Sequence, residues 1–147
     1  IDLSDINGRL PIHLAAANGH IAVVEYLLDE GIDINVLDSE DQTILHYAVA
    51  NGYIDMVRFL IERGSNVDAK NRDGKTPLHI ASENGYSEIV EYLVACSANY
   101  MIKDNTGYNA SRYYPKIYKK FAFKRARKNR GWGIRKNMNS KGRVKLK

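Results

Sequence analysis

The sequence predicts an all-α solenoid, in which short helix–turn–helix units of equal length stack one after another. Two observations carry this prediction. Identical residues recur at a fixed step of 33 positions, and they are His13, His46 and His79, Gly19, Gly52 and Gly85, and Ala15, Ala48 and Ala81. Each unit also holds two segments with apolar residues at helical spacing, joined by an Asn-Gly pair. A fixed period of this size indicates a repeat architecture, whose neighbouring units bury one continuous core.

The first unit, repeat one, spans residues 5–37. Asn7-Gly8 predicts a turn, because glycine adopts positive φ without steric cost. Pro11 suits the first position of a helix, and Asn18-Gly19 ends that helix with the glycine in a left-handed cap. A second helix is expected to begin near His20 and to close at Gly31.

Repeat two (38–70) and repeat three (71–103) keep this plan with a few substitutions. Asp41 replaces the turn glycine, although aspartate tolerates left-handed geometry less well. Thr43 and Thr76 are expected to cap the first helices, and Pro77 takes the first helical position of repeat three. Ser97 replaces the glycine that closes the second helix.

The second helix of each repeat carries an apolar stripe that predicts core. The stripes are Ile21, Val23, Val24, Leu27 and Leu28 in repeat one, Ile54, Met56, Val57, Leu60 and Ile61 in repeat two, and Ile89, Val90, Leu93 and Val94 in repeat three. A single unit cannot bury such a face alone, so the stripes are expected to be covered by stacking.

The hexapeptide Thr-Pro-Leu-His-Ile-Ala at 76–81 resembles the signature of the ankyrin repeat, and repeats one and two carry related versions at 10–15 and 43–48. The resemblance covers about residues 1–111 and implies β-hairpin turns between the helix pairs. The three histidines of this motif stand one per repeat and form a row, whereas a metal needs several ligands around one point. We therefore expect each imidazole to bond turn backbone and to orient the next hairpin.

A fourth unit begins at Asp104 and then departs from the pattern. Arg112 stands where the histidine would be, and Pro115 falls inside the expected first helix, where proline breaks a helix. A further apolar and aromatic series at roughly helical spacing predicts a short helix that caps repeat three: Tyr113, Tyr114, Ile117, Tyr118 and Phe121. The sequence thus predicts an ankyrin repeat domain at 1–111 with a partial unit at 104–114, a basic capping helix at 112–128 and a basic flexible tail at 129–147.

Charge divides the chain sharply. Residues 1–111 hold all 17 acidic and seven basic residues, a net charge of −10, whereas residues 112–147 hold the other 15 basic residues and no acid. The tail is expected to reach either nucleic acid or an import receptor, or to fold back on the acidic repeats. The residues predicted to serve nucleic-acid binding or nuclear import are Lys119, Lys120, Lys124, Arg125, Arg127, Lys128 and Arg130.

Composition and missing motifs narrow the remaining classes. A single cysteine, Cys96, excludes an internal disulfide and fits a reducing compartment, and no apolar run approaches the ~18 residues of a membrane span. We expect an intracellular protein, cytoplasmic, nuclear or both, without a membrane or small-molecule partner. The sequence shows no phosphate loop, nucleophile elbow or metal-binding helix motif, so we expect no enzyme, cofactor or metal. Because Ile1-Asp2-Leu3-Ser4 aligns with the end of repeat one, the chain is expected to begin inside an earlier repeat.

The function favoured by the sequence is that of a non-catalytic adaptor. The resemblance implies that a partner protein docks on the concave face, which the turns and first helices line. Carried over by position, the predicted partner-binding residues are Asn7, Arg9, Asn18, Glu40, Gln42, Asn51, Arg72, Asp73, Lys75, Glu83, Asn84 and Tyr108. The alternative is a nuclear, nucleic-acid-associated regulator that acts through the basic tail.

Overall fold

The computed structural model describes residues 4–6 and 8–122. The chain divides into two compact units, residues 1–114 and residues 115–147. The first unit contains α1 (Pro11–Ala17), α2 (Ile21–Asp29), α3 (Ile44–Ala50), α4 (Ile54–Glu62), α5 (Pro77–Glu83), α6 (Ser87–Ala95) and the short 3-10 helix η1 (Ala110–Arg112). The fold is the predicted all-α repeat solenoid, but no strand forms in the described residues, so loops stand where the resemblance implied β-hairpin turns.

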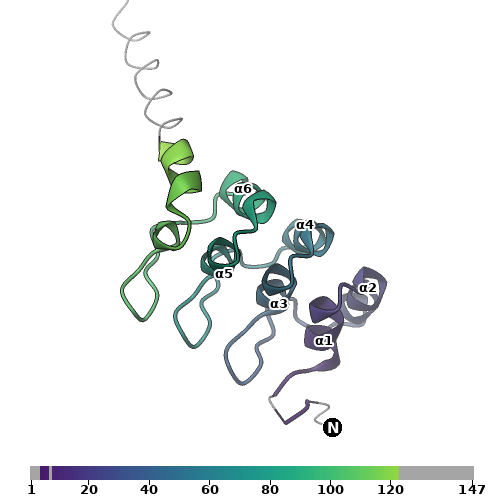
Figure 1. Ribbon diagram of the computed structural model, residues 1–147. Helices are drawn as coiled ribbons and strands as arrows, with labels where there is room; N and C mark the ends of the chain where they lie inside the picture. Colours follow the sequence, from purple (N-terminus) through teal and green to yellow (C-terminus); the bar gives the residue numbers. More distant parts are fainter. Residues whose placement is uncertain (1–3, 7, 123–147) are drawn as a thin grey trace, which may run out of the picture. The chain divides into compact units, whose positions relative to one another are not determined.

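The helices of the first unit form two rows. The first helices of the repeats, α1, α3 and α5, pack against one another in sequence, and η1 packs on α5 at the end of this inner row. The second helices, α2, α4 and α6, each pack on their own partner and form the outer row. The loops that contain residues 38–42, 71–75 and 104–108 project on the same side of the inner row (Figure 1).

The predicted helix boundaries follow from local chemistry. The hydroxyls of Thr43 and Thr76 accept hydrogen bonds from the backbone N–H groups of His46 and His79, which satisfies a donor that the first helical turn leaves free. The glycine of each Asn-Gly pair ends its helix at a φ between 69° and 75°, as predicted. Asp41 does adopt the left-handed conformation of the glycine it replaces, with a φ of 59°.

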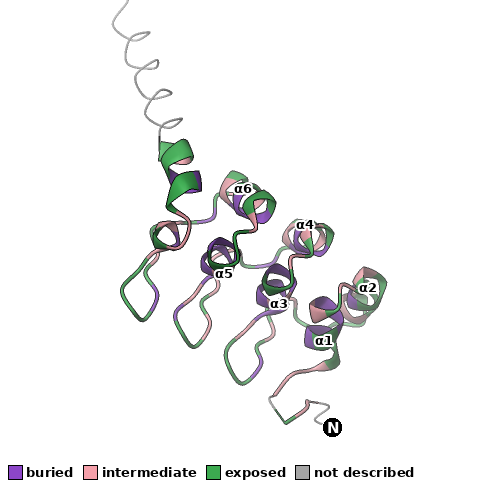
Figure 2. Ribbon diagram, in the orientation of Figure 1, coloured by how far each residue is buried: buried purple, intermediate pink, exposed green. Residues whose placement is uncertain are grey.

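The core lies between the two rows and between successive repeats, where Figure 2 shows the buried segments. Met56, Val57 and Leu60 of α4 and Ile89, Val90 and Leu93 of α6 are all at most 2% exposed, as the stripes predicted. In α2, however, only Val24 is buried. The prediction that Val23 belongs to the core is wrong, because this side chain is 48% exposed. Burial of this register requires a preceding repeat, and the described residues supply none ahead of α1.

The histidine prediction is confirmed. The Nδ1 atom of His46 accepts the Thr43 N–H at 3.1 Å, so the ring's proton lies on Nε2, which donates to the Lys75 carbonyl at 3.0 Å. His79 makes the same bridge to the Tyr108 carbonyl at 3.0 Å. Burial lowers the pKa of His46, and the bonds to the Lys75 and Ala69 carbonyls oppose this only in part. The His46 imidazole therefore stays neutral in a buried position between two repeats.

The end of the first unit departs from the predicted helix. The fourth unit forms only η1 where the earlier repeats have a seven-residue helix, and Tyr113 and Tyr114 lie in a turn outside any helix. The residue before a proline is driven out of helical geometry, while proline itself suits a first helical position. Helix therefore begins at Pro115 and continues to 122 in the described residues. Within this second unit, the rings of Tyr118 and Phe121 meet edge to face at 5.6 Å. Whether this helix caps repeat three stays a prediction, as does the division at 112–128.

Candidate functional site

The projecting loops share one construction. Each begins with an Asp or Asn whose side-chain oxygen accepts a backbone N–H four residues later, at 2.9 Å from Gln42 to Asp38, 3.0 Å from Lys75 to Asn71 and 3.1 Å from Tyr108 to Asp104. The backbone returns the contact, for example from the Asn71 N–H to the Lys75 carbonyl at 2.9 Å. These internal bonds give each tip a defined backbone shape without help from a strand.

The tips are also tied to one another. The Arg72 N–H donates to the Glu40 carbonyl at 2.9 Å, and the Asn105 N–H donates to the Asp73 carbonyl at 3.0 Å. The Asn105 side-chain amide adds a bond to the Arg72 carbonyl at 2.8 Å. Gly74 lies under this contact, because a Cβ atom there would come within 2.5 Å of the Asn105 amide oxygen. Successive tips therefore hold a fixed spacing.

Exposed side chains decorate this row. We call five exposed side chains of the second, third and fourth tips the tip surface: Glu40, Arg72, Asp73, Asn105 and Tyr108. The Arg72 guanidinium lies 3.8 Å from the Glu40 carboxylate, and both groups are more than half exposed. Such an ion pair contributes little to stability, so both charges remain available to a partner.

Two tyrosines brace the tips from the inner row. The Tyr47 hydroxyl donates to the Asp38 carboxylate, and the Tyr113 hydroxyl donates to the Asp104 carboxylate. Burial and the bond to the carboxylate raise the pKa of Tyr47 well above its usual range. Burial would raise the pKa of Asp104, but bonds from Thr106, Tyr113 and the backbone outweigh it and hold this pKa well below its usual range.

Basic and aromatic groups meet beside the fourth tip. The Lys75 ammonium binds the Glu83 carboxylate at 2.9 Å and lies 5.5 Å from the Tyr113 ring centroid. The Tyr113 ring contacts Tyr108 edge to face at 6.4 Å, and the Arg112 guanidinium lies 4.9 Å from the Tyr108 centroid. Stacked aromatic and cationic groups of this kind are common anchors in protein interfaces.

Ten of the twelve predicted partner-binding residues fall into three groups. Glu40, Arg72, Asp73 and Tyr108 lie on the tip surface, and Gln42, Lys75 and Glu83 lie beside it. Three others use their side-chain amides to cap their own helices, with bonds of 2.8, 2.9 and 3.0 Å to helix carbonyls: Asn18, Asn51 and Asn84.

Arg9 is held against Asp5, with two side-chain contacts at 2.8 Å. Asn7 lies outside the described residues. So do five of the predicted tail residues, Lys124, Arg125, Arg127, Lys128 and Arg130. Lys119 and Lys120 are exposed on the helix of the second unit.

Sequence reasoning missed the two bracing tyrosines. Local helical spacing places Tyr113 in the predicted capping helix, whereas this residue stands 66 positions after Tyr47 and thus in the repeat register. The signal was present as an Asp followed nine residues later by a Tyr, at 38 and 47 and again at 104 and 113.

The three repeats match a known family of proteins. A sequence model described as ankyrin repeats, in three copies, matches residues 12–104. The chain belongs to the ankyrin repeat family. The match begins in the first helix of repeat one, includes the buried histidines of all three repeats and ends at the first residue of the fourth tip.

Two curated relatives of this ankyrin repeat chain match it over short segments. Alpha-latrotoxin-Lt1a of Latrodectus tredecimguttatus is 49% identical over 35 residues, which cover 24% of this chain and 2% of the toxin. An L-asparaginase of Dirofilaria immitis is 43% identical over 44 residues, 29% of this chain and 8% of that protein. The matched segment is thus a small part of each relative.

Other kinds of site find little support in the described residues. Within 4–6 and 8–122, no group of three His, Cys, Asp or Glu side chains is arranged to hold a metal ion. None of the helices in this part of the chain is long and apolar enough to cross a membrane.

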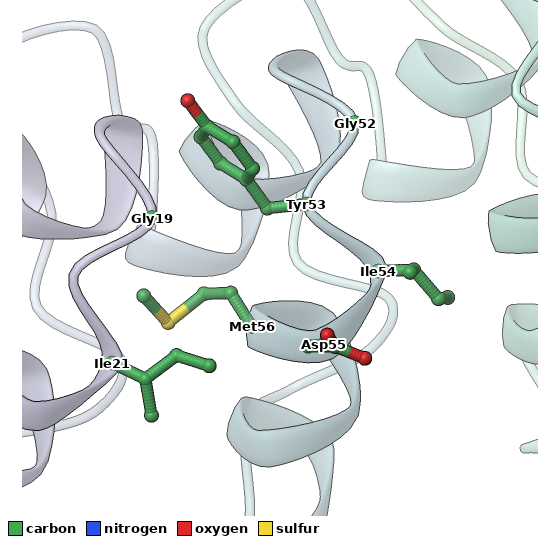
Figure 3. Close-up of a pocket in the computed structure, with 7 residues that line it drawn as sticks. All are labelled: Gly19, Ile21, Gly52, Tyr53, Ile54, Asp55 and Met56. Carbon is green, nitrogen blue, oxygen red and sulfur yellow. The ribbon is translucent and has the colours of Figure 1, made fainter.

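Two surface hollows of about 260 and 240 Å³ lie at the turns between helices, in the same register of neighbouring repeats. Figure 3 shows the first, which is lined by Gly19, Ile21, Gly52, Tyr53, Ile54, Asp55 and Met56. Because the hollow repeats with the fold, it is a product of stacking.

Proposed function

We propose that this ankyrin repeat chain is a non-catalytic adaptor that binds a partner protein on its concave face, across the tip surface. Ankyrin repeats generally serve protein–protein interaction, which supports a protein as the class of partner. The observation that carries the proposal is the chain of bonds from tip to tip, through Glu40, Arg72, Asp73 and Asn105. A partner that meets pre-ordered groups loses less conformational entropy on binding.

The chemistry of the tip surface favours a partner segment of mixed character. Arg72 and Asp73 offer opposite charges, and Tyr108, 45% exposed, offers an aromatic surface with Arg112 stacked on it. Tyrosine and arginine are the residues most often found at energetic centres of interfaces. We expect Tyr108 to anchor the partner and the charges around it to set the binding orientation.

Photo-crosslinking tests this proposal by position. A photoreactive phenylalanine replaces Tyr108 on the tip surface, and a matched chain carries it in place of Glu62, exposed on α4 in the outer row. In extract of the organism that encodes the chain, we expect a defined protein adduct from position 108 and none from position 62. The Arg72→Ala substitution should weaken the adduct. Adducts at position 62 alone, or equal adducts insensitive to Arg72→Ala, would move the docking site to the outer row.

A second function is favoured by the charge division of the sequence. Fifteen basic residues without an acid follow residue 111, and such a segment releases counterions from a phosphate backbone. We propose that this segment contacts nucleic acid or an import receptor. The test compares the full chain with a variant in which Lys124, Arg125, Arg127, Lys128 and Arg130 are alanine. A labelled single-stranded RNA should bind the full chain with steep salt dependence and the variant at least tenfold more weakly. Equally weak binding by both would remove nucleic acid as the partner.

A further inference from the structure

Four of the five arginines in the part of the chain that the structure describes pair with a carboxylate. These pairs are Arg9 with Asp5, Arg58 with Glu88, Arg63 with Glu25 and Asp29, and Arg72 with Glu40. The fifth, Arg112, is exposed at the end of η1, and its guanidinium forms no hydrogen bond or ion pair with a described residue. Its N–H donors are therefore open to a ligand.

Arg112 stands where each repeat has a buried histidine, 33 positions after His79. His79 is 1% exposed and bonds the Tyr108 carbonyl at 3.0 Å. The Arg112 guanidinium instead lies 4.9 Å from the centroid of the Tyr108 ring. At this position the fourth unit thus replaces a buried structural bridge with an exposed cation beside the tip surface.

The ring that carries Arg112 is held from several sides. The Tyr108 N–H donates to the Asp104 carboxylate at 3.1 Å, and the Tyr108 carbonyl accepts the bond from His79. The Tyr113 ring meets that of Tyr108 edge to face at 6.4 Å. A guanidinium that stacks on a fixed ring keeps its planar fork of donors in a defined orientation. This preorganisation lowers the entropic cost of binding a ligand.

The last acid of the sequence does not supply the missing carboxylate. Asp104 Oδ1 accepts the N–H groups of Thr106 and Tyr108 at 2.9 and 3.1 Å, and Oδ2 accepts the Tyr113 hydroxyl. The sequence has no acid after Asp104. A ligand that brings its own carboxylate to Arg112 therefore meets no competing acid within the rest of the fourth tip or η1.

We propose that Arg112 binds a carboxylate of the partner segment that docks on the tip surface, through two parallel N–H···O bonds. This inference rests on the proposed function and names the chemistry of its partner, a peptide segment with an Asp or Glu beside the residue that packs on Tyr108. Arginine pairs with carboxylates in this two-bond geometry, which adds direction as well as strength to the contact.

The charge of the repeats limits the partner to a segment with few acids. Residues 1–111 carry a net charge of −10, which repels anions over a Debye length of about 8 Å at physiological salt. Glu40 and Asp73 belong to the same tip surface. A nucleic acid would bring a phosphate on every nucleotide against these carboxylates. A peptide can place one carboxylate at Arg112 and neutral or basic residues beside Glu40 and Asp73.

Selection from a phage-displayed peptide library tests the proposal on the full chain. The parent, Arg112→Gln and Arg58→Gln are used in parallel. Arg58→Gln is the matched control, because Arg58 is also exposed and lies 5.5 Å from a ring centroid, that of Tyr92, but in the outer row. We expect peptides enriched on the parent to share an acid at one position, a preference that Arg58→Gln keeps and Arg112→Gln loses. No preference for an acid, or the same preference on Arg112→Gln, would overturn the proposal.

A synthetic peptide from the selection gives affinities by fluorescence polarisation. Arg112→Gln should weaken binding about tenfold or more, as expected for the loss of a charge-assisted bond. Arg112→Lys should recover only part of this loss, because lysine keeps the charge but lacks the planar fork. Replacing the peptide's acid with its amide should weaken binding to the parent by a similar factor and binding to Arg112→Gln no further, because groups in direct contact are coupled. Additive losses would show that the acid binds elsewhere.

Tyr108→Ala separates this inference from the proposed function. Peptides that lose affinity for Tyr108→Ala but not for Arg112→Gln would retain the tip surface as the docking site and overturn the inference alone. If neither substitution affects any selected peptide, both fail. A labelled single-stranded RNA covers the other class of ligand. A loss of RNA binding in Arg112→Gln, without an acid preference among the peptides, would assign Arg112 to phosphate and replace the proposal.

Discussion

Substituting Gly52 by alanine should destabilise the protein more than the same change at Gly85. Both glycines end an inner helix at a left-handed φ, 75° for Gly52 and 69° for Gly85. Alanine pays about 1–2 kcal/mol for this conformation and regains about 0.4–1 kcal/mol because it restricts the unfolded chain. The two sites share this cost, so Gly85→Ala should lower the free energy of unfolding by about 1 kcal/mol.

Gly52 carries a second cost, because the Tyr86 ring lies over it. A Cβ atom at Gly52 would lie 3.2 Å from the ring's Cζ, inside the about 3.5–4.0 Å of a relaxed carbon contact. No atom of the residues that the structure describes lies within 4 Å of a Cβ atom at Gly85. Tyr86 is only half-buried and can yield, so we place the extra cost at about 1 kcal/mol, the low end of the overpacking range.

Urea unfolding followed by circular dichroism measures both variants against the parent chain. Adding Tyr86→Ala to each variant should remove the extra cost at Gly52 and leave the Gly85 value unchanged. If the two glycine variants lose the same free energy, within about 0.3 kcal/mol, the ring contact has no energetic role and the reasoning fails.

Three further predictions follow from the buried polar groups. Ser65→Ala should stabilise the protein by about 1 kcal/mol in urea unfolding, because the buried hydroxyl has no hydrogen-bond partner among the described residues and Ala98 occupies the same register; a loss of stability would indicate an unseen partner. Tyr113→Phe should cost about 1–2 kcal/mol through the lost bond to Asp104. The pKa of Asp104 is lowered in the folded state, so its stabilisation is present above its unfolded value and is lost as the pH falls; in the variant, acid unfolding should therefore begin at higher pH, and an unchanged acid midpoint would contradict this. The pKa of His46 is also lowered in the folded state, so stability should decrease as the pH falls below about 6.5, with a smaller slope in His46→Gln; equal slopes would exclude this histidine as the cause.

The repeat register explains why so much of the fold could be predicted from sequence. The positions of the histidines and glycines set the ends of the helices, because each has one geometric role per repeat, as His46 does between Thr43 and Lys75. Each role depends on the local backbone and on one adjacent repeat, and the sequence pattern that sets both recurs every 33 residues.

The remaining features depend on context that a local pattern lacks. The apolar residues of α2 have the same spacing as those of α4 and α6. Hydrophobic spacing alone therefore could not distinguish the exposed Val23 from the buried Met56. Tyr113 fits both the helical spacing with Ile117 and the repeat spacing with Tyr47. Because the helix begins at Pro115, Tyr113 lies outside it and takes the repeat position of Tyr47. Of the four asparagines predicted to meet a partner, Asn18, Asn51 and Asn84 cap their own helices, because a short amide side chain reaches a helix carbonyl four residues back.

The imidazole bridges also determine how the chain would lengthen under tension. The bond from His46 to Lys75 and that from His79 to Tyr108 each close a segment of 29 residues, whereas His13 bonds the carbonyl of Val36, only 23 residues away. A pulling force that ruptures one long bridge and unfolds the segment it closes would release about 100 Å of chain at the extended length of ~3.5 Å per residue. The repeats therefore form a series of near-equal links, and the short first bridge makes repeat one the link that differs.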